Sequence, residues 1–241
     1  MKSTWLIAGA MSLGLVATGA MAADRQSSGA DAWVEGWMGL EIIEENGGFA
    51  ASGLIDFISE GTGGAHTHES VSTLVGVGAT QSMVVDLADY GGDHVWQYVT
   101  IDTNDGDNMN TSWGLAADAD NTEWYGIIVV GSPGAQTTTM HPAHDDYLQI
   151  WLNGEQVYDN DQWTGGVRTV TAPTDIDLNA GDNVMLFKCG ESGGSAYLNV
   201  FLDADNLGIA PDVEGNFFNI ISDVEAQGKA SVTWAGLKSD R

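Results

Sequence analysis

The sequence predicts an all-β protein, a jelly-roll-like antiparallel β-sandwich behind a cleaved signal peptide. Short segments rich in Val, Ile, Trp and Tyr alternate with turn residues, and the 241 residues include 32 glycines but only 4 prolines. Short strand-forming segments separated by turn residues are typical of β-sandwiches. Apolar residues at helical spacing are rare, so we expect almost no helix. The expected strands are residues 33–43, 53–58, 71–77, 83–87, 95–101, 112–116, 125–130, 146–152, 156–158, 176–178, 183–189 and 197–202.

The first 22 residues have the features of a secretory signal peptide. Lys2 precedes an apolar run from Trp5 to Val16, and the small-residue pattern Ala20-Met21-Ala22 follows. A charged start, a short apolar run and small residues at the end are what export signals require. We expect cleavage after Ala22 and export to the periplasm, the cell surface or the medium. The run is too short to cross a bilayer, and we expect no membrane span.

One β-sandwich domain is expected over residues 23–205. After it the chain changes character, and residues 206–241 are expected to form a C-terminal tail. Three of the seven basic residues lie in its last 13 positions, at Lys229, Lys238 and Arg241. The tail is either an attachment segment or an added edge strand, since Val232 and Trp234 alternate with polar residues as a strand would.

Charge and cysteine content restrict the partners and the way the fold is stabilised. The formal net charge of −27 arises from 34 acidic and only 7 basic residues. So acidic a surface disfavours nucleic acid and anionic membranes as partners. Cys189 is the only cysteine, which excludes an internal disulfide. Because it lies in the apolar segment 184–189, we expect a buried, inert thiol.

The clearest local prediction is a hairpin over residues 147–158. Leu148, Ile150 and Leu152 share one face of the first strand, and the residues between them share the other. Asn153-Gly154 then supplies the two positive-φ positions of a type I′ turn. The hairpin is expected to hold polar loops at its ends.

Acidic residues flank this hairpin on both sides. Asp145 and Asp146 precede it, and Asp159-Asn160-Asp161 ends it. Oxygen ligands from two loops suit Ca²⁺, and adjacent carboxylates repel unless a cation or proton intervenes. The expected metal ligands are therefore Asp145, Asp146, Asn160 and Asp161. The alternative is that the pair only caps a turn.

Tryptophans near these loops are candidates for contact with a sugar, because an indole face stacks on a pyranose ring. We expect Trp151 and Trp163 to form the platform, with Asp159 and His144 beside it as further ligand-binding residues. Against this, most tryptophans in a sandwich are buried in the core.

The histidines suggest another metal site. His66 and His68, with His141 and His144, are closely spaced pairs that together could bind Zn²⁺ or Cu²⁺. The alternative is that the pairs lie on separate loops and never meet. The sequence has no recognisable nucleophile, phosphate-binding or zinc-protease motif, so we do not expect an enzyme.

Part of the chain resembles a known family. Residues 145–160, followed by Trp163, residues 176–188 and residues 195–202, are similar to the second half of protective-antigen-type β-sandwiches, within the wider galactose-binding-like sandwiches of secreted bacterial proteins. In lectins of that family an adjacent Asp pair holds a Ca²⁺ that also coordinates sugar hydroxyls, with an Asn from a neighbouring loop. The resemblance implies that Asp145 and Asp146 are that pair and makes Asn160 the candidate for the Asn.

These observations favour a secreted, non-catalytic carbohydrate-binding or adhesion module, with Ca²⁺ as its expected ion and an extracellular glycan or polysaccharide as its partner. One alternative is a structural, self-associating protein of the cell surface or extracellular matrix. Another is a metal-dependent enzyme that uses the histidine pairs.

Overall fold

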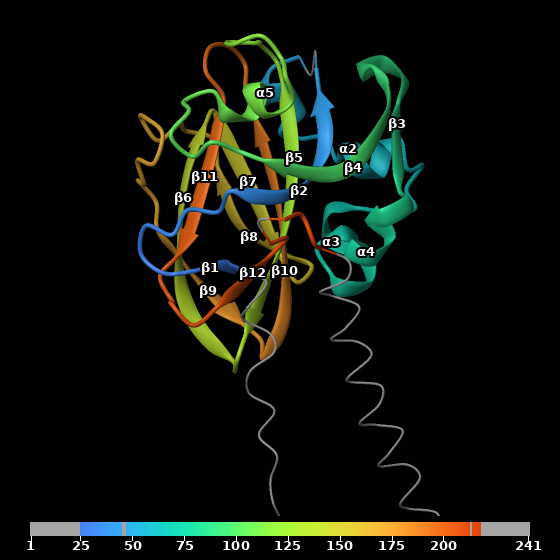
Figure 1. The fold of residues 1–241 in the computed structure, drawn as a ribbon. Coiled ribbons are helices and arrows are strands. Elements are labelled where there is room, and N and C mark those ends of the chain that lie inside the picture. Colours follow the sequence, from blue (N-terminus) through green and yellow to red (C-terminus); the bar gives the residue numbers. More distant parts are fainter. Residues whose placement is uncertain (1–24, 45–46, 213, 218–241) are drawn as a thin grey trace, which may run out of the picture.

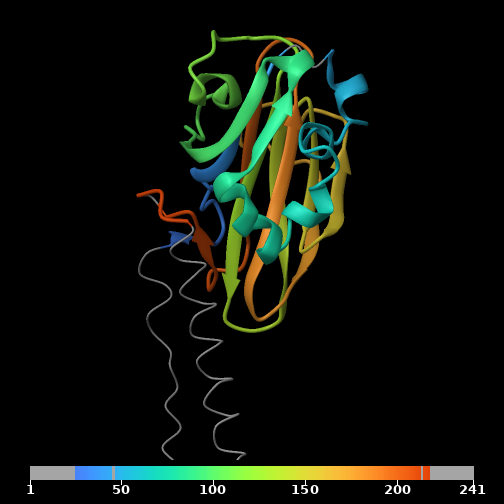
Figure 2. The same ribbon diagram turned by 90° about the vertical axis from the view of Figure 1, so that its right-hand side faces the viewer.

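The computed structural model describes residues 25–44, 47–212 and 214–217. Over these residues two antiparallel sheets pack face to face, and short helices cover the outer side of the larger sheet (Figures 1 and 2). The prediction of an antiparallel β-sandwich is confirmed. The expected signal peptide lies outside the described residues. In the described part of the chain, no helix combines the length and the apolar character needed to cross a membrane.

The two sheets are unequal in size. The larger has nine strands, with the order β3-β4-β2-β5-β10-β7-β8, and β12 joins it through β5 while β1 pairs with β12. Its strands are β1 (Gln26–Ser27), β2 (Gly36–Ile43), β3 (Val84–Leu87), β4 (Gly92–Thr100), β5 (Glu123–Ser132), β7 (Tyr147–Leu152), β8 (Glu155–Asn160), β10 (Gly181–Gly190) and β12 (Gly208–Ala210). The smaller sheet has the order β11-β6-β9, with β6 (Gln136–Asp145), β9 (Thr174–Leu178) and β11 (Tyr197–Leu202).

The central strands of the larger sheet are buried on both faces. Successive side chains of a strand point to opposite faces, so β5 and β10 contribute to two cores. Ile128 and Phe187 belong to the core between the sheets, whereas Ile127 and Leu186 belong to the core beneath the helices. This double burial explains why the two strands are almost continuously apolar.

Short helices and turns occupy three places where the sequence predicts strands: 71–77 is mostly helical, whereas only 57–58 of the first segment and 112 of the last are helical. The predicted strands at 53–58, 71–77 and 112–116 are wrong. The helices are α1 (Phe49–Ser52), α2 (Phe57–Gly61), α3 (His68–Val71), α4 (Leu74–Ala79) and α5 (Asn108–Ser112), with 3₁₀ turns η1 (Thr80–Ser82) and η2 (Ala88–Tyr90).

Side-chain caps explain why the chain turns helical at α2, α3 and α4, whereas α5 begins without one. The Asp56 carboxylate accepts from the Ser59 N–H at 2.8 Å, at the start of α2. Thr67 and Ser70 form a reciprocal capping box at the start of α3, and Thr73 caps α4. Such caps satisfy N–H groups that the first helical turn leaves without partners. They outweigh the β-branched composition that favours a strand over 71–77.

One long strand, β6, is absent from the sequence prediction. It contains Pro142, which has no N–H to donate and usually argues against a central strand. Here β9 pairs with β6 only as far as Met140, so beyond it β6 bonds to β11 alone. Pro142 therefore lies where one side of the strand needs no donor.

The folded domain extends beyond the expected boundary at residue 205. Strand β12 pairs with β5, and Leu207 and Ile209 belong to the core between the sheets. The start of the predicted tail is therefore part of the larger sheet. Residues 218–241, which carry the three basic side chains, lie outside the described residues.

The predicted hairpin is confirmed. Strands β7 and β8 pair antiparallel, and the turn residues Asn153 and Gly154 have φ of 52° and 92°. Leu148 faces the core between the sheets. Cys189 is fully buried, as expected, and burial raises the pKa of its thiol well above the ordinary value.

Candidate functional site

Strand register brings three carboxylates together at one end of the sandwich. Strand β6 ends at Asp145, and Asp146 links it to β7. Strand β10 ends at Gly190, which pairs with Tyr147. Glu191, the next residue, therefore comes to lie beside the two aspartates. This end of the sandwich is at the top of Figure 1, where the loop after β10 approaches the segment that follows α5.

We call Asp145, Asp146 and Glu191 the acidic triad. One oxygen from each of the three lies within 4.8 Å of the others, and no other group of three His, Cys, Asp or Glu residues in the described part of the chain meets this condition. Glu191 is fully buried and forms no ion pair with a described residue, and the Gly193 N–H is the backbone donor that acts to lower the pKa of its carboxyl group. Asp146 Oδ2 accepts from the Ser192 N–H at 3.0 Å.

Burial and mutual repulsion make the triad unfavourable as three bare anions. Burial, and then the charge of Asp146, raise the pKa of Asp145 to about 7. Burial, followed by the charges of Asp146 and Asp145, raises the pKa of Glu191 to about 8. A buried carboxylate without a countercharge is costly unless it is neutralised. The arrangement suits a hard cation such as Ca²⁺, which prefers carboxylate oxygens and accepts further oxygens from water or a ligand.

The other two expected metal ligands do not join this group. The Asn160 side-chain oxygen accepts from the Gln162 N–H at 3.0 Å, and its NH₂ donates to the Tyr158 hydroxyl at 3.0 Å. Asn160 thus stabilises the turn after β8. Asp161 lies on the exposed start of the next loop, outside the triad. The prediction of Asn160 and Asp161 as ligands is not supported, because the third carboxylate comes from the loop after β10.

Two of the expected sugar-contacting residues lie on the helix side of the larger sheet. Trp151 is 4% exposed and packs on the His68 ring with centroids 4.2 Å apart. The prediction that its indole is a binding platform is wrong, because the helices cover this face. Asp159 is exposed and pairs with Gln149. Strand alternation points it away from the face of its neighbour Asn160.

Of the other two expected sugar-contacting residues, Trp163 is exposed and His144 is buried. Trp163 is 58% exposed and lies in the loop between β8 and β9. The next residue, Thr164, donates its N–H to the His144 carbonyl at 3.0 Å, which places this loop beside the end of β6. The role of Trp163 in ligand binding stays a prediction. His144 is fully buried with Nε2 3.1 Å from the Tyr158 hydroxyl, so the expectation that it contacts a ligand is wrong.

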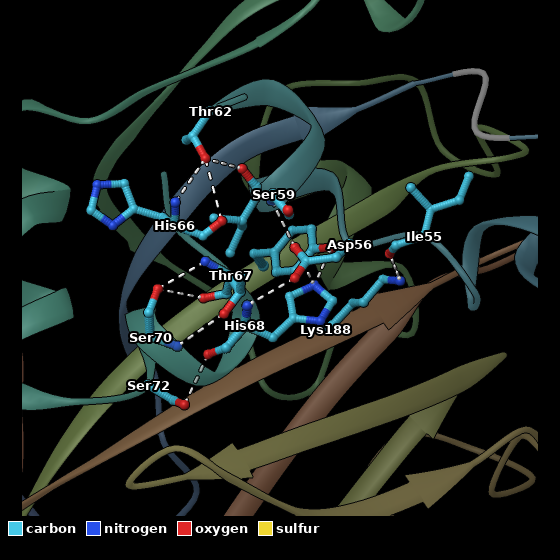
Figure 3. Close-up of polar contacts among 12 residues, drawn as sticks. Ile55, Asp56, Ser59, Thr62, His66, Thr67, His68, Ser70, Ser72 and Lys188 are labelled. Carbon is cyan, nitrogen blue, oxygen red and sulfur yellow. Dashed lines mark hydrogen bonds and ion pairs between the residues drawn. The ribbon is translucent and has the colours of Figure 1, made fainter. Parts of the chain in front are cut away.

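The histidine pairs do not converge. His68, the first residue of α3, is buried against the larger sheet, and Figure 3 shows the His66 ring pointing away from it. The His141 ring stacks on Phe201 with centroids 4.3 Å apart, and its Nε2 lies 2.9 Å from Asp203 Oδ1. His144 lies in the core of the sandwich. The alternative metal site built from these histidines is therefore not formed, because its members belong to different layers.

A second polar cluster fastens the helices to the larger sheet (Figure 3). Lys188 is fully buried and its Nζ donates to the carbonyls of Ser52 and Ile55, each at 2.7 Å. His68 Nε2 lies 3.0 Å from the Tyr125 hydroxyl and 3.2 Å from Asp56 Oδ1. Burial, with the charge of Lys188 as a smaller cause, lowers the pKa of His68 to about 3. This neutral imidazole joins α3 to the sheet.

Sequence reasoning identified two members of the triad and missed the third. Glu191 comes two residues after the predicted apolar strand 183–189, and this position is the signal that was available. Only the pairing of β10 with β7 shows that the end of this strand meets Asp146.

The comparisons with known proteins give likenesses only among solved structures. No protein-family model and no curated protein matches the chain. It is similar to a PA14 sugar-binding domain from an RTX adhesin, at 15% identity and a TM-score of 0.37, over 70% of this chain and 89% of that one. The PA14 domain of the antifreeze protein MpAFP gives 13% identity and a TM-score of 0.38, over 76% and 94% of the two chains.

A family 35 carbohydrate-binding module from Cellvibrio japonicus gives 17% identity and a TM-score of 0.28, over 45% of this chain and 84% of that one. Likeness at these identities and TM-scores does not assign a function to the chain. The functional argument below therefore starts from the acidic triad.

Proposed function

We propose that the protein is an exported, non-catalytic module that binds Ca²⁺ at the acidic triad and captures an extracellular glycan there. The observation that carries this proposal is Glu191, a fully buried carboxylate that no cation pairs with among the described residues, within 4.8 Å of two further carboxylates. Buried charged groups are nearly always paired or bound to a metal. A bound cation would supply the missing partner.

Each triad residue would have a distinct part in holding the ion. Asp145 ends β6 and Asp146 links β6 to β7, so the pairing of β6 with β11 and of β7 with β10 fixes their positions. Glu191 follows β10, whose pairing with β7 fixes it relative to them. The Ser192 N–H orients Asp146. When bound, Ca²⁺ would supply coordination positions for sugar hydroxyls, since three carboxylates leave several of its six to eight positions open.

Trp163 is the residue best placed to contact the body of the sugar. Its indole is the most exposed large aromatic side chain in the described part of the chain, and an exposed indole is an effective stacking surface. The loop that carries it is anchored by the Gly166 N–H, which donates to the Tyr197 hydroxyl at 2.9 Å. Tyr197 pairs with Asp145. The platform and the ion would therefore be held by the same end of the sandwich.

Calorimetric titration with CaCl₂ after EDTA treatment tests the metal half of the proposal. We expect one Ca²⁺ per chain and a higher melting temperature, since a ligand in hundredfold excess over Kd stabilises the fold by about 2.7 kcal/mol. Asp145→Asn/Asp146→Asn and Glu191→Gln should each abolish the response. Glu155→Gln, at the exposed start of β8, should leave it intact. A wild-type chain that ignores Ca²⁺ would refute the metal site.

A glycan array read with and without Ca²⁺ tests the ligand half. We expect binding that disappears on EDTA treatment and in Glu191→Gln. Trp163→Ala should weaken glycan binding while leaving the calcium titration unchanged. If calcium binds but no glycan on the array does so in a calcium-dependent way, the ion is structural and the carbohydrate-binding role is rejected.

A further inference from the structure

The loop after β10 contacts both the acidic triad and the first helix of the outer layer. Ser192 directly follows Glu191 and makes hydrogen bonds to two separate elements. Its N–H donates to Asp146 Oδ2 at 3.0 Å, within the triad. Its hydroxyl oxygen accepts from the Phe49 N–H at 2.8 Å, at the start of α1. One residue therefore joins the triad to α1.

Helix α1 has few means of holding its own conformation. It is only four residues long, and Ser52 is its one buried residue. Its N-cap residue is Gly48, which has no side chain to accept a bond from the first N–H groups. Helices this short do not persist in water without tertiary contacts, and a first turn without a cap is less stable. The Ser192 hydroxyl supplies this cap from outside the helix.

The far end of α1 is held by a contact that does not involve the triad. Lys188 lies in β10, is fully buried, and donates from Nζ to the Ser52 carbonyl oxygen at 2.7 Å. At the near end, the Phe49 ring packs on the Tyr147 ring with centroids 5.7 Å apart, but Phe49 stays partly exposed. The start of α1 is therefore the end that a shift of Ser192 can release.

Repulsion within the triad acts directly on the position of Ser192. Asp146 holds Ser192 by a hydrogen bond, and Glu191 holds it by a peptide bond. Carboxylate oxygens of these two residues and of Asp145 lie within 4.8 Å of one another. Bare carboxylates at this separation repel, whereas a shared cation draws them together. The loop continues as Gly193-Gly194, and glycine permits a backbone shift at little steric cost.

We propose that cation binding at the acidic triad is coupled through Ser192 to the capping of α1. With the ion bound, the Ser192 hydroxyl keeps the start of α1 on the sandwich. Without it, repulsion within the triad moves Ser192 and the first turn of α1 opens. This inference rests on the calcium half of the proposed function and is independent of the glycan half. Ser192 is then a positioning residue between the ion site and the outer layer.

Hydrogen exchange of the full chain, read by mass spectrometry in EDTA and in saturating CaCl₂, tests the coupling. Residues 49–55 include the amides that bond within α1 and the one that bonds to Ser192. We expect calcium to slow their exchange about tenfold, a usual size for coupling between two sites. Helices α3 and α4 are capped by their own Thr67 and Thr73, so their exchange should not change. Equal slowing in all three helices would indicate general stabilisation by a bound ligand and overturn the proposal.

Two serines of the same loop give matched variants. Ser192→Ala removes the hydroxyl that caps α1 but keeps the N–H that bonds to Asp146. Calcium should still bind, while its effect on residues 49–55 falls below about twofold. Because coupling is reciprocal, the affinity for calcium should weaken by no more than the factor lost in exchange. Ser195→Ala is the control, since Ser195 is exposed and its hydroxyl donates to Asp118 Oδ1 at 3.1 Å, and it should keep the full effect.

Calorimetry on the same samples separates failure of this inference from failure of the calcium site. If calcium binds to the wild type but exchange of residues 49–55 does not change, the coupling is overturned and the metal site stands. If calcium does not bind, the metal site is refuted and the coupling with it. A full calcium effect that survives in Ser192→Ala would show that α1 responds through another contact, and would overturn the role of Ser192.

Discussion

Replacing the buried Lys188 with Met tests whether the polar cluster holds the helices on the larger sheet. The change keeps an unbranched side chain of similar length but removes the donor for the Ser52 and Ile55 carbonyls, each 2.7 Å from Nζ. It also leaves the Glu123 carboxylate, 3.9 Å from Nζ and fully buried, without its cation. The helices α1 and α2 lose their main polar attachment to β10.

The expected loss of stability is about 3–5 kcal/mol, the usual cost of removing one member of a buried ion pair. Two hydrogen bonds from a charged donor, at about 1.5–3 kcal/mol each, give a loss of the same order. For a domain of this size, each kcal/mol lowers the melting temperature by about 2–4 °C. We therefore expect Lys188→Met to melt about 6–20 °C below the wild type.

Urea unfolding followed by tryptophan fluorescence measures this loss. The matched control is Gln149→Met, because Gln149 lies directly opposite Lys188 on β7 and should cost less than about 1 kcal/mol, as most changes outside the core do. Adding Glu123→Gln to Lys188→Met should recover part of the stability, since it removes the uncompensated charge. A loss below about 1 kcal/mol in Lys188→Met would refute the reasoning.

Three further outcomes follow from buried groups. The pKa of His68, about 3, lies below its unfolded value of 6.5, so the unfolded chain binds the proton more readily and stability falls between pH 6.5 and about 3. His68→Gln should therefore reduce the loss in unfolding free energy between pH 7 and pH 5 by about 1–2 kcal/mol, and an unchanged loss would contradict this. The pKa of Glu191 is raised from 4.5 to about 8, so ionisation destabilises the metal-free fold above pH 4.5. In EDTA at pH 8, Glu191→Gln should melt about 4–8 °C above the wild type, which corresponds to about 2 kcal/mol, and a lower melting point would count against a carboxylate without a countercharge. Cys189 should react with Ellman's reagent only after unfolding, because it is fully buried with a raised pKa, and rapid reaction of the folded chain would show that this strand opens.

The sequence predicts those elements whose signal is local. The hairpin of β7 and β8 follows from alternation and from Asn153-Gly154, whose φ values are both positive. The segment 71–77 fails because its valines favour a strand, whereas Thr73 caps a helix through a bond to the Gly76 N–H at 3.1 Å. Propensity is a weak guide where a cap and a buried face decide the conformation.

In the candidate site, too, the sequence predicts what has a local signal and misses what depends on how distant segments pack. Asp145 and Asp146 are adjacent in sequence and carry their own signal. Glu191 joins them only through the pairing of β10 with β7, and Trp151 is lost as a platform because helices cover its face of the sheet. A contact that depends on register or on a covering layer has no local signature.

The double burial of the larger sheet has a consequence for how the protein opens. Water has access to neither face along the middle of β5 and β10, because one face lies in each core. Backbone amides there exchange with solvent only when the whole domain unfolds, whereas the short capped helices can detach in a smaller, partial opening. Lys188 lies on β10, and Glu191 lies in the loop that continues directly from this strand. The loops that hold the acidic triad are therefore attached to the slowest-exchanging part of the molecule, even while the outer layer opens.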